Sequence, residues 1–156
     1  MQRLVTFGCS YTYGEGLKDC WVPVGNTMGP GPNASKYAWP ALVANKLNFN
    51  LLNQGLGGAS NKYIWHKMLQ TKLTKSDTVV FLWTYHNRMC FFDHSDEHSR
   101  IIIQDIDNKN QSIDRQKLAK LYFKHIYKEY DSIIDTWNRI NFSKLYLDKH
   151  GIKNHH

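Results

Sequence analysis

Two short polar segments follow apolar runs near the start of the chain, and the first carries a possible nucleophile. The run of residues 4–7 breaks at Gly8, and Ser10 follows two residues later. A buried parallel strand that ends there would present the Ser10 hydroxyl at the carboxyl end of a sheet, where open α/β proteins bind ligands. A serine hydroxyl can attack a carbonyl carbon, and nearby backbone N–H groups can stabilise the oxyanion that forms.

Two further polar segments are expected at the same edge of the sheet. Residues 53–61, Asn-Gln-Gly-Leu-Gly-Gly-Ala-Ser-Asn, follow the second apolar run, and their glycines allow a tight backbone turn. Residues 84–88 follow the run 78–83, whose β-branched and aromatic composition favours a strand. The carboxyl ends of parallel strands lie at one edge, so the three segments could form one site.

These segments resemble the first three sequence blocks of the SGNH (GDSL-like) hydrolases. Residues 7–12, Phe-Gly-Cys-Ser-Tyr-Thr, are similar to the block that carries the nucleophile, with cysteine where the family usually has aspartate. The resemblance implies that Ser10 is the nucleophile. It also implies an oxyanion hole built from the N–H groups of Ser10 and Gly58 and the side-chain amide of Asn87, or from His86 in place of Asn87.

The last block of the family, Asp-x-x-His, has no counterpart in this sequence. Asp148 and His150 have the wrong spacing, and no aspartate stands three residues before His155 or His156. Without a histidine base, the serine hydroxyl stays protonated near neutral pH and is a poor nucleophile. We expect a domain truncated at its C-terminal side and inactive as it stands, or one that takes its base from the loop after the third strand (His86, His94 or His98).

The hydrophobic pattern predicts strands that alternate with helices. The expected elements are a strand over 3–7, a helix over 37–47, a strand over 49–52, a helix over 61–73, a strand over 78–83, a long or broken helix over 112–150, and an unfinished strand from Ile152. This order predicts a three-layer α/β/α fold with three core strands in a parallel sheet. The resemblance implies the same flavodoxin-like architecture.

Residues 10–35 are rich in glycine and proline and are expected to form a long loop. A loop of this length in a compact domain is usually functional or mobile. Three aromatic residues lie in or beside it, and they are candidates to line a sugar or acyl site, with ordinary packing as the alternative (Trp21, Tyr37 and Trp39).

Composition limits the class of protein. The 156 residues fit one domain spanning 1–156, and the 42% hydrophobic content is sufficient for a core and too high for disorder. The net charge of +7 comes from scattered bases, which favours a solvated basic surface over nucleic-acid binding. With no signal-peptide pattern and no apolar run that could cross a membrane, we expect a cytoplasmic location.

Cysteine and histidine spacing gives no indication of a metal site. The three cysteines lack C-x-x-C spacing, so neither a zinc site nor a disulfide framework is expected. His94 and His98 are four residues apart, but their surroundings are typical of a solvated polar loop rather than a helix. The family resemblance likewise implies no metal and no organic cofactor.

The preferred function, implied by the resemblance, is a serine esterase that removes an acyl or acetyl group from a carbohydrate or lipid. The alternatives are a non-catalytic glycan-binding module or pseudoenzyme on the same fold, and a basic nucleic-acid binder. A small-molecule or carbohydrate ester is the expected partner. If no strand covers the apolar edge at residues 79–82, self-association or a complementary chain is also expected.

Overall fold

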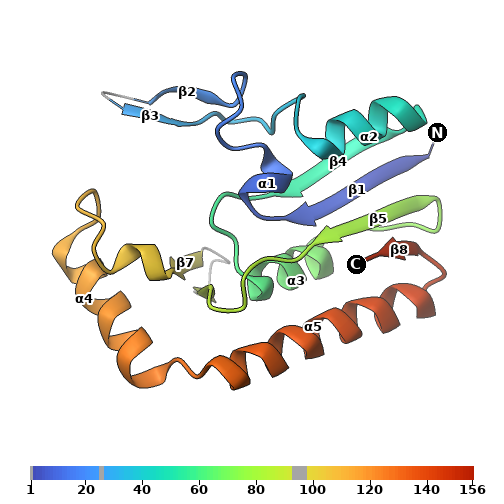
Figure 1. Ribbon diagram of the computed structural model, residues 1–156. Helices are drawn as coiled ribbons and strands as arrows, with labels where there is room; N and C mark the ends of the chain where they lie inside the picture. Colours follow the sequence, from blue (N-terminus) through green and yellow to red (C-terminus); the bar gives the residue numbers. More distant parts are fainter. Residues whose placement is uncertain (1, 25–26, 93–97) are drawn as a thin grey trace.

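A four-stranded parallel sheet forms the centre of the computed structural model, which describes residues 2–24, 27–92 and 98–156 (Figure 1). The strand order is β4-β1-β5-β8, and each neighbouring pair is parallel. The predicted α/β class with a parallel sheet is confirmed. The four strands are β1 (Arg3–Gly8), β4 (Asn50–Gly55), β5 (Asp77–Leu82) and β8 (Lys153–His155).

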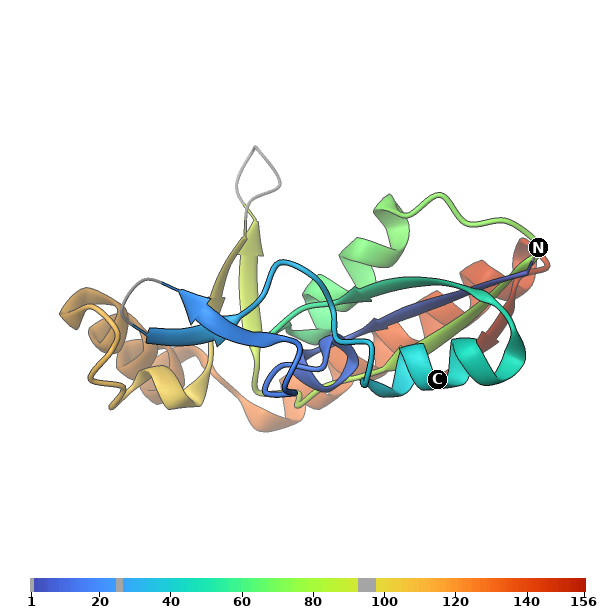
Figure 2. The ribbon, with the colours of Figure 1, turned by 90° about the horizontal axis from the view of Figure 1, so that it is seen from above.

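Helices cover both faces of the sheet, as the three-layer prediction requires. Helix α2 (Trp39–Leu47) lies on one face and α3 (Asn61–Gln70) on the other (Figure 2). Helix α5 (Glu129–Lys149) packs against α3 and β8. No helix in the described ranges combines the length and the apolar character needed to cross a bilayer.

Local sequence explains where the two shorter helices begin. Pro40 stands in the first turn of α2, where its missing N–H costs nothing. The Ser60 hydroxyl accepts a hydrogen bond from the Tyr63 N–H at 3.2 Å and so caps α3.

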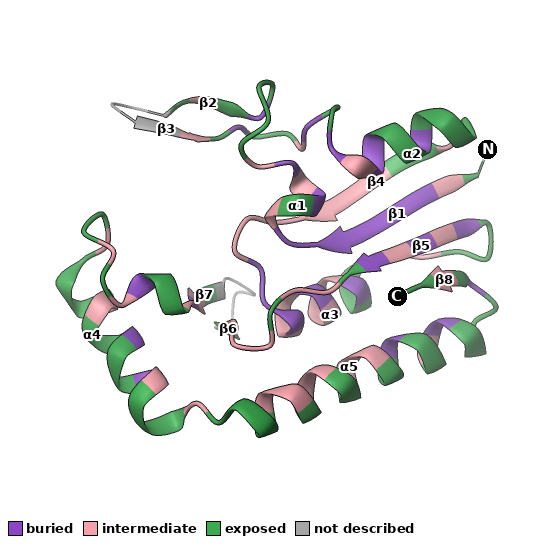
Figure 3. Ribbon diagram, in the orientation of Figure 1, coloured by how far each residue is buried: buried purple, intermediate pink, exposed green. Residues whose placement is uncertain are grey.

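Strand β1 is buried on both faces, which is typical of a central parallel strand (Figure 3). On the α3–α5 face, Val5 and Phe7 pack with Val79 and Phe81 of β5, and Leu147 of α5 belongs to the same cluster. The rings of Phe7 and Phe81 are stacked with their centroids 5.2 Å apart. This packing fixes the end of β1, and therefore the position of the turn that follows it.

Strand β8 is the strand expected from Ile152, and it brings the sheet to four strands rather than the three predicted. It was not counted among the core strands because its residues, Lys153 to His155, are polar. It pairs with Thr78–Val80 of β5, so this part of the predicted open edge has a neighbour. The pairing does not extend to Phe81 and Leu82.

Two hairpins lie outside the main sheet, in segments that the sequence pattern predicted to be irregular. Strands β2 (Trp21–Val24) and β3 (Thr27–Pro30) pair within the expected loop, which also begins with the short helix α1 (Ser10–Tyr13). Strands β6 (Met89–Phe92) and β7 (His98–Ile101) pair after β5. Strand β7 ends at Ile101, and a 3-10 turn (Ile103–Asp105) follows it.

The C-terminal helical region was predicted to be either one long helix or a broken one, and it is broken. Helix α4 (Ile113–Leu121) continues into a π-helical turn (Tyr122–Ile126), and Tyr127 and Lys128 are extended before α5 starts. Much of the surface of α4 and α5 is exposed (Figure 3). Apolar residues at helical spacing such as Leu118 and Leu121 are more than half exposed, so the spacing does not mark one continuous core face.

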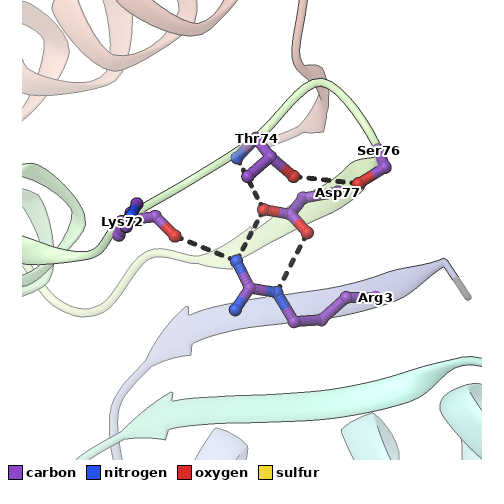
Figure 4. Close-up of polar contacts among 5 residues, drawn as sticks. All are labelled: Arg3, Lys72, Thr74, Ser76 and Asp77. Atoms are coloured by element: carbon purple, nitrogen blue, oxygen red, sulfur yellow. Dashed lines mark hydrogen bonds and ion pairs between the residues drawn. The ribbon is translucent and has the colours of Figure 1, made fainter.

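An ion pair joins β1 and β5 at the amino end of the sheet, opposite the predicted site (Figure 4). Arg3 donates from Nε and Nη2 to the two carboxylate oxygens of Asp77 at 2.9 and 2.7 Å. The Thr74 N–H donates to the same carboxylate at 2.8 Å. Burial raises the pKa of Asp77, but these hydrogen bonds and the charge of Arg3 outweigh it and hold the pKa below its ordinary value.

Candidate functional site

A cavity of about 570 Å³ opens at the carboxyl end of the sheet, between the connection after β5 and the middle of α5. Its walls are mostly apolar and aromatic, with few polar groups, a composition typical of small-molecule sites. Residues from three parts of the chain line it, among them Cys9, Tyr11, Trp83, His86, Ile133 and Trp137.

Ser10 is the first residue of α1, directly after β1. The helix is a single turn, closed by hydrogen bonds from Thr12 N and Tyr13 N to Cys9 O, both of 3.0 Å. Ser10 is partly exposed, and its neighbours Cys9 and Tyr11 both line the cavity. The structure therefore places the predicted nucleophile beside an apolar chamber, although Ser10 itself is not among the lining residues.

Gly58 lies in the turn after β4, which is tied to the end of β1 by a hydrogen bond from Leu56 N to Gly8 O at 3.1 Å. Its φ of +71° belongs to the left-handed region that favours glycine. Arg100 of β7 donates from Nη1 to Gly57 O, and a Cβ on Gly58 would collide with its guanidinium. Gly58 is thus held at the same edge of the sheet as Ser10, with a cation against it.

Asn87 lies in a tight turn in which Arg88 N donates to Tyr85 O at 3.2 Å. It is partly buried and does not line the cavity, whereas Thr84, Tyr85 and His86 do. The structure therefore brings the alternative residue of this segment, His86, to the cavity.

Asn61 fixes this connection, a role that the sequence reasoning missed. Its side chain is buried, and it accepts from Thr84 N at 2.8 Å and donates to Thr84 O at 3.0 Å. It also donates to Thr136 Oγ1 of α5 at 3.1 Å. One amide thereby joins α3, the β5–β6 connection and α5. An asparagine directly after the Ser60 cap was the available signal, but spacing alone does not reveal a partner 75 residues away.

Both ring nitrogens of His86 lie near side chains at the break before α5 and at its first residue. Nδ1 lies 3.1 Å from the Tyr127 hydroxyl, and Nε2 lies 3.9 Å from Glu129 Oε1. Neither of these two contacts involves Ser10.

The buried Cys9 thiol occupies the position beside Ser10. Burial raises the pKa of Cys9, but hydrogen bonds from the Tyr11 N–H and from the Thr84 and Ser10 hydroxyls, with the charge of Arg88, outweigh it and lower the pKa. Ser10 and Arg88 therefore both act on the sulfur at the cavity wall.

The three aromatic candidates from the first loop lie elsewhere. Trp21 is in β2 and is 39% exposed, and Trp39 begins α2 with its Nε1 buried. Tyr37 is 41% exposed, with the Lys18 ammonium 4.6 Å from its ring centroid. None of the three lines the cavity between β5 and α5.

Within the described ranges, no group of three histidine, cysteine, aspartate or glutamate residues is placed to hold a metal ion. His94 lies outside the described residues, as does the side chain of His98. The placement of this histidine pair in a solvated polar loop therefore stays a prediction.

No protein-family model and no curated protein matches this sequence. Among solved structures, one is similar to 99% of this chain and 76% of its own chain, at 13% identity and a TM-score of 0.37. It is a protein assigned to the G-D-S-L lipolytic family, from Desulfitobacterium hafniense DCB-2. A similarity at this level carries no argument, so the fold class rests on the sheet topology described above.

Proposed function

We propose that this chain is a serine ester hydrolase of the SGNH type that binds the acyl part of its substrate in the apolar cavity. The observation that carries the proposal is the place of Ser10 in the chain. It is partly exposed at the carboxyl end of β1, between two residues, Cys9 and Tyr11, that line the cavity. An acyl chain bound in the cavity would bring its carbonyl carbon to the Ser10 hydroxyl.

In the proposed reaction, Ser10 Oγ forms a bond to the carbonyl carbon and the ester C–O bond breaks. The Ser10 proton passes to a base and then to the departing alcohol, and water later releases the acid by the reverse steps. The N–H groups of Ser10 and Gly58 and the Asn87 amide are assigned to the oxyanion. His86 is assigned as the base because it lines the same cavity, and its ring must turn away from Tyr127 to act.

One observation favours a second candidate function, a module that binds the same ligand without hydrolysing it. Tyr127 lies beside Nδ1 of His86, and Glu129 lies beside Nε2. While these contacts hold the ring, His86 does not act as the base, and a serine without a base is a weak nucleophile. Such a module would keep the cavity and lose the chemistry.

Hydrolysis of p-nitrophenyl esters and labelling by a fluorophosphonate distinguish these functions. We expect both signals in the wild type, their loss in Ser10→Ala, and a large decrease in His86→Ala. Ser76→Ala is the matched control, because Ser76 is an exposed serine at the amino end of β5. If a well-folded wild type shows neither signal but still binds an apolar ligand, the binding module is the correct function.

A further inference from the structure

A second cavity of about 380 Å³ adjoins the apolar one and differs from it in chemistry. The two cavities share His86 and Thr136 in their linings, so they are neighbouring compartments. The first has mostly apolar walls, whereas the second is lined by several charged side chains (Lys62, Arg88, Arg139, Asp131 and Asp135).

Two of the three cations in the second cavity lack an acidic partner among the described residues. Arg88 Nη1 is buried with no hydrogen-bond partner, and the guanidinium lies 5.4 Å from the Tyr85 ring centroid. Lys62 Nζ lies 5.7 and 5.5 Å from the ring centroids of Phe91 and Phe92, with no acid recorded beside it. Arg88 and Lys62 both line the cavity, so their positive charges favour a ligand that carries an anionic group there.

The third cation is already neutralised. Arg139 donates from Nε and Nη2 to Asp135 at 2.8 and 2.7 Å, in a bidentate ion pair along α5. Asp131 is the remaining acid in the lining, and it is exposed. Leaving His86 aside, three positive and two negative side chains give the cavity an excess of one positive charge.

The start of helix α3 adds to this positive character. Asn61 and Lys62, its first two residues, line the second cavity, and its first turn contains no acidic residue. The Ser60 cap accepts only the Tyr63 N–H, so other N–H groups of the first turn lack a partner within the helix. These groups and the helix dipole favour an anion near this end.

Arg88 connects the two cavities. It lines the second, and its charge also acts on Cys9, which lines the first. An anionic group held by Arg88 would therefore lie close to the apolar cavity. The two cavities together match a ligand with one apolar and one anionic part.

We propose that the second cavity binds the anionic group, a phosphate or a carboxylate, of an amphiphilic ligand whose apolar chain occupies the first cavity. The inference rests on the proposed function for the apolar cavity, and it adds the anionic head group to the substrate class. Lys62 and Arg88 provide the charge, and the start of α3 provides backbone donors.

Binding of three ligands with the same chain tests this inference without any hydrolysis: octyl phosphate, octanoate and 1-octanol. Trp83 and Trp137 line the apolar cavity, so tryptophan fluorescence reports binding of each. We expect at least one of the anions to bind about tenfold more tightly than 1-octanol, which equals about 1.4 kcal/mol. This advantage should decrease with added salt, whereas 1-octanol binding should not.

Substitutions in the second cavity test whether its side chains cause the tighter binding of the anionic ligands. Arg88→Gln and Lys62→Gln should each reduce the preference for the anion several-fold and leave 1-octanol binding unchanged. Lys67→Gln is the matched control, because Lys67 is on the same helix but does not line the second cavity. Circular dichroism checks folding, and if Arg88→Gln does not fold, the ligand series on the wild type and Lys62→Gln still decide.

Equal affinity for the three ligands, or an anion preference that survives both substitutions, overturns the inference. In that case, binding of 1-octanol and labelling of Ser10 would leave the proposed function in place. Absence of binding for all three ligands would overturn the inference and the assigned acyl cavity together. Comparing octyl phosphate with octanoate identifies which head group the site prefers.

Discussion

At the scale of single residues, the structure contains a few glycines whose backbone conformation would strain any other residue. Gly58 is the clearest example, because it combines a left-handed backbone with the close approach of Arg100. Gly16 has a similar φ of +91°, but a Cβ there would meet nothing within 4 Å. Comparing substitutions at Gly58 and Gly16 therefore separates two effects on the free energy of unfolding, backbone strain and the collision with Arg100.

We expect Gly58→Ala to lower the free energy of unfolding by about 2–3 kcal/mol, from backbone strain and the displaced guanidinium. Gly16→Ala should cost only about 1 kcal/mol, because it adds strain alone. Urea unfolding measures both. Adding Arg100→Ala to Gly58→Ala should recover part of the loss. If the two glycine substitutions cost the same, Arg100 does not restrict the turn.

At the scale of elements, the ion pair between Arg3 and Asp77 fixes the register of the two central strands. The Asp77 side chain is 2% exposed and that of Arg3 is 32% exposed, so the pair is partly shielded from water. It lies at the amino end of the sheet, and so it can be changed without touching the candidate site.

Asp77→Asn should lower the free energy of unfolding by about 2–3 kcal/mol at neutral pH, because it leaves Arg3 without its carboxylate. The pKa of Asp77 is lowered in the folded state, so its contribution is present above the unfolded value near 3.9 and is lost as the pH falls from there through the lower folded value. Urea unfolding of the wild type should therefore show a steeper loss of stability on acidification than the variant. Asp107→Asn, at an exposed acid, is the control, and an equal pH dependence in both variants would contradict this account.

The central strands and the two shorter helices could be predicted from sequence because their residues carry strong local signals. Residues 4–8 are apolar or small throughout, and Ser60 caps α3 with its own side chain. The two hairpins were missed because each consists of two short strands that pair only with one another, outside the main sheet. The break at Tyr127 and Lys128 contains neither glycine nor proline, so its position could not be predicted.

The candidate site was predictable in part for the same reason. Ser10 follows a strand that its own sequence identifies, and the structure places it at the carboxyl edge. The cavity beside it depends on Ile133 and Trp137, which lie more than 120 residues later and face the site only through tertiary packing. The buried Asn61 likewise gains its role from partners in other elements.

At the scale of the whole molecule, helices α4 and α5 carry exposed apolar side chains over much of their length (Figure 3). Leu118, Leu121 and Leu145 are 55%, 57% and 69% exposed. Apolar surface of this extent is typical of contact with another chain. Self-association through these side chains, or through the part of the β5 edge that β8 does not cover, stays a prediction.

We expect light scattering to show an average mass that rises with protein concentration. The double variant Leu121→Lys/Leu145→Lys should reduce this rise, since it places charge among the exposed apolar side chains. Leu42→Lys on α2, at an equally exposed leucine of the opposite face, is the control. A wild type that stays monodisperse and monomeric at all concentrations would contradict the prediction.

The bend between α4 and α5 links remote parts of this molecule. Tyr127 stands at the bend, and its hydroxyl holds the imidazole of His86, a residue that borders both cavities. Any change in the tilt of α4 would be transmitted to that ring and so to the passage between the two chambers. Engineering of ligand selectivity can therefore start from the outer turns of α4, far from the ligand itself.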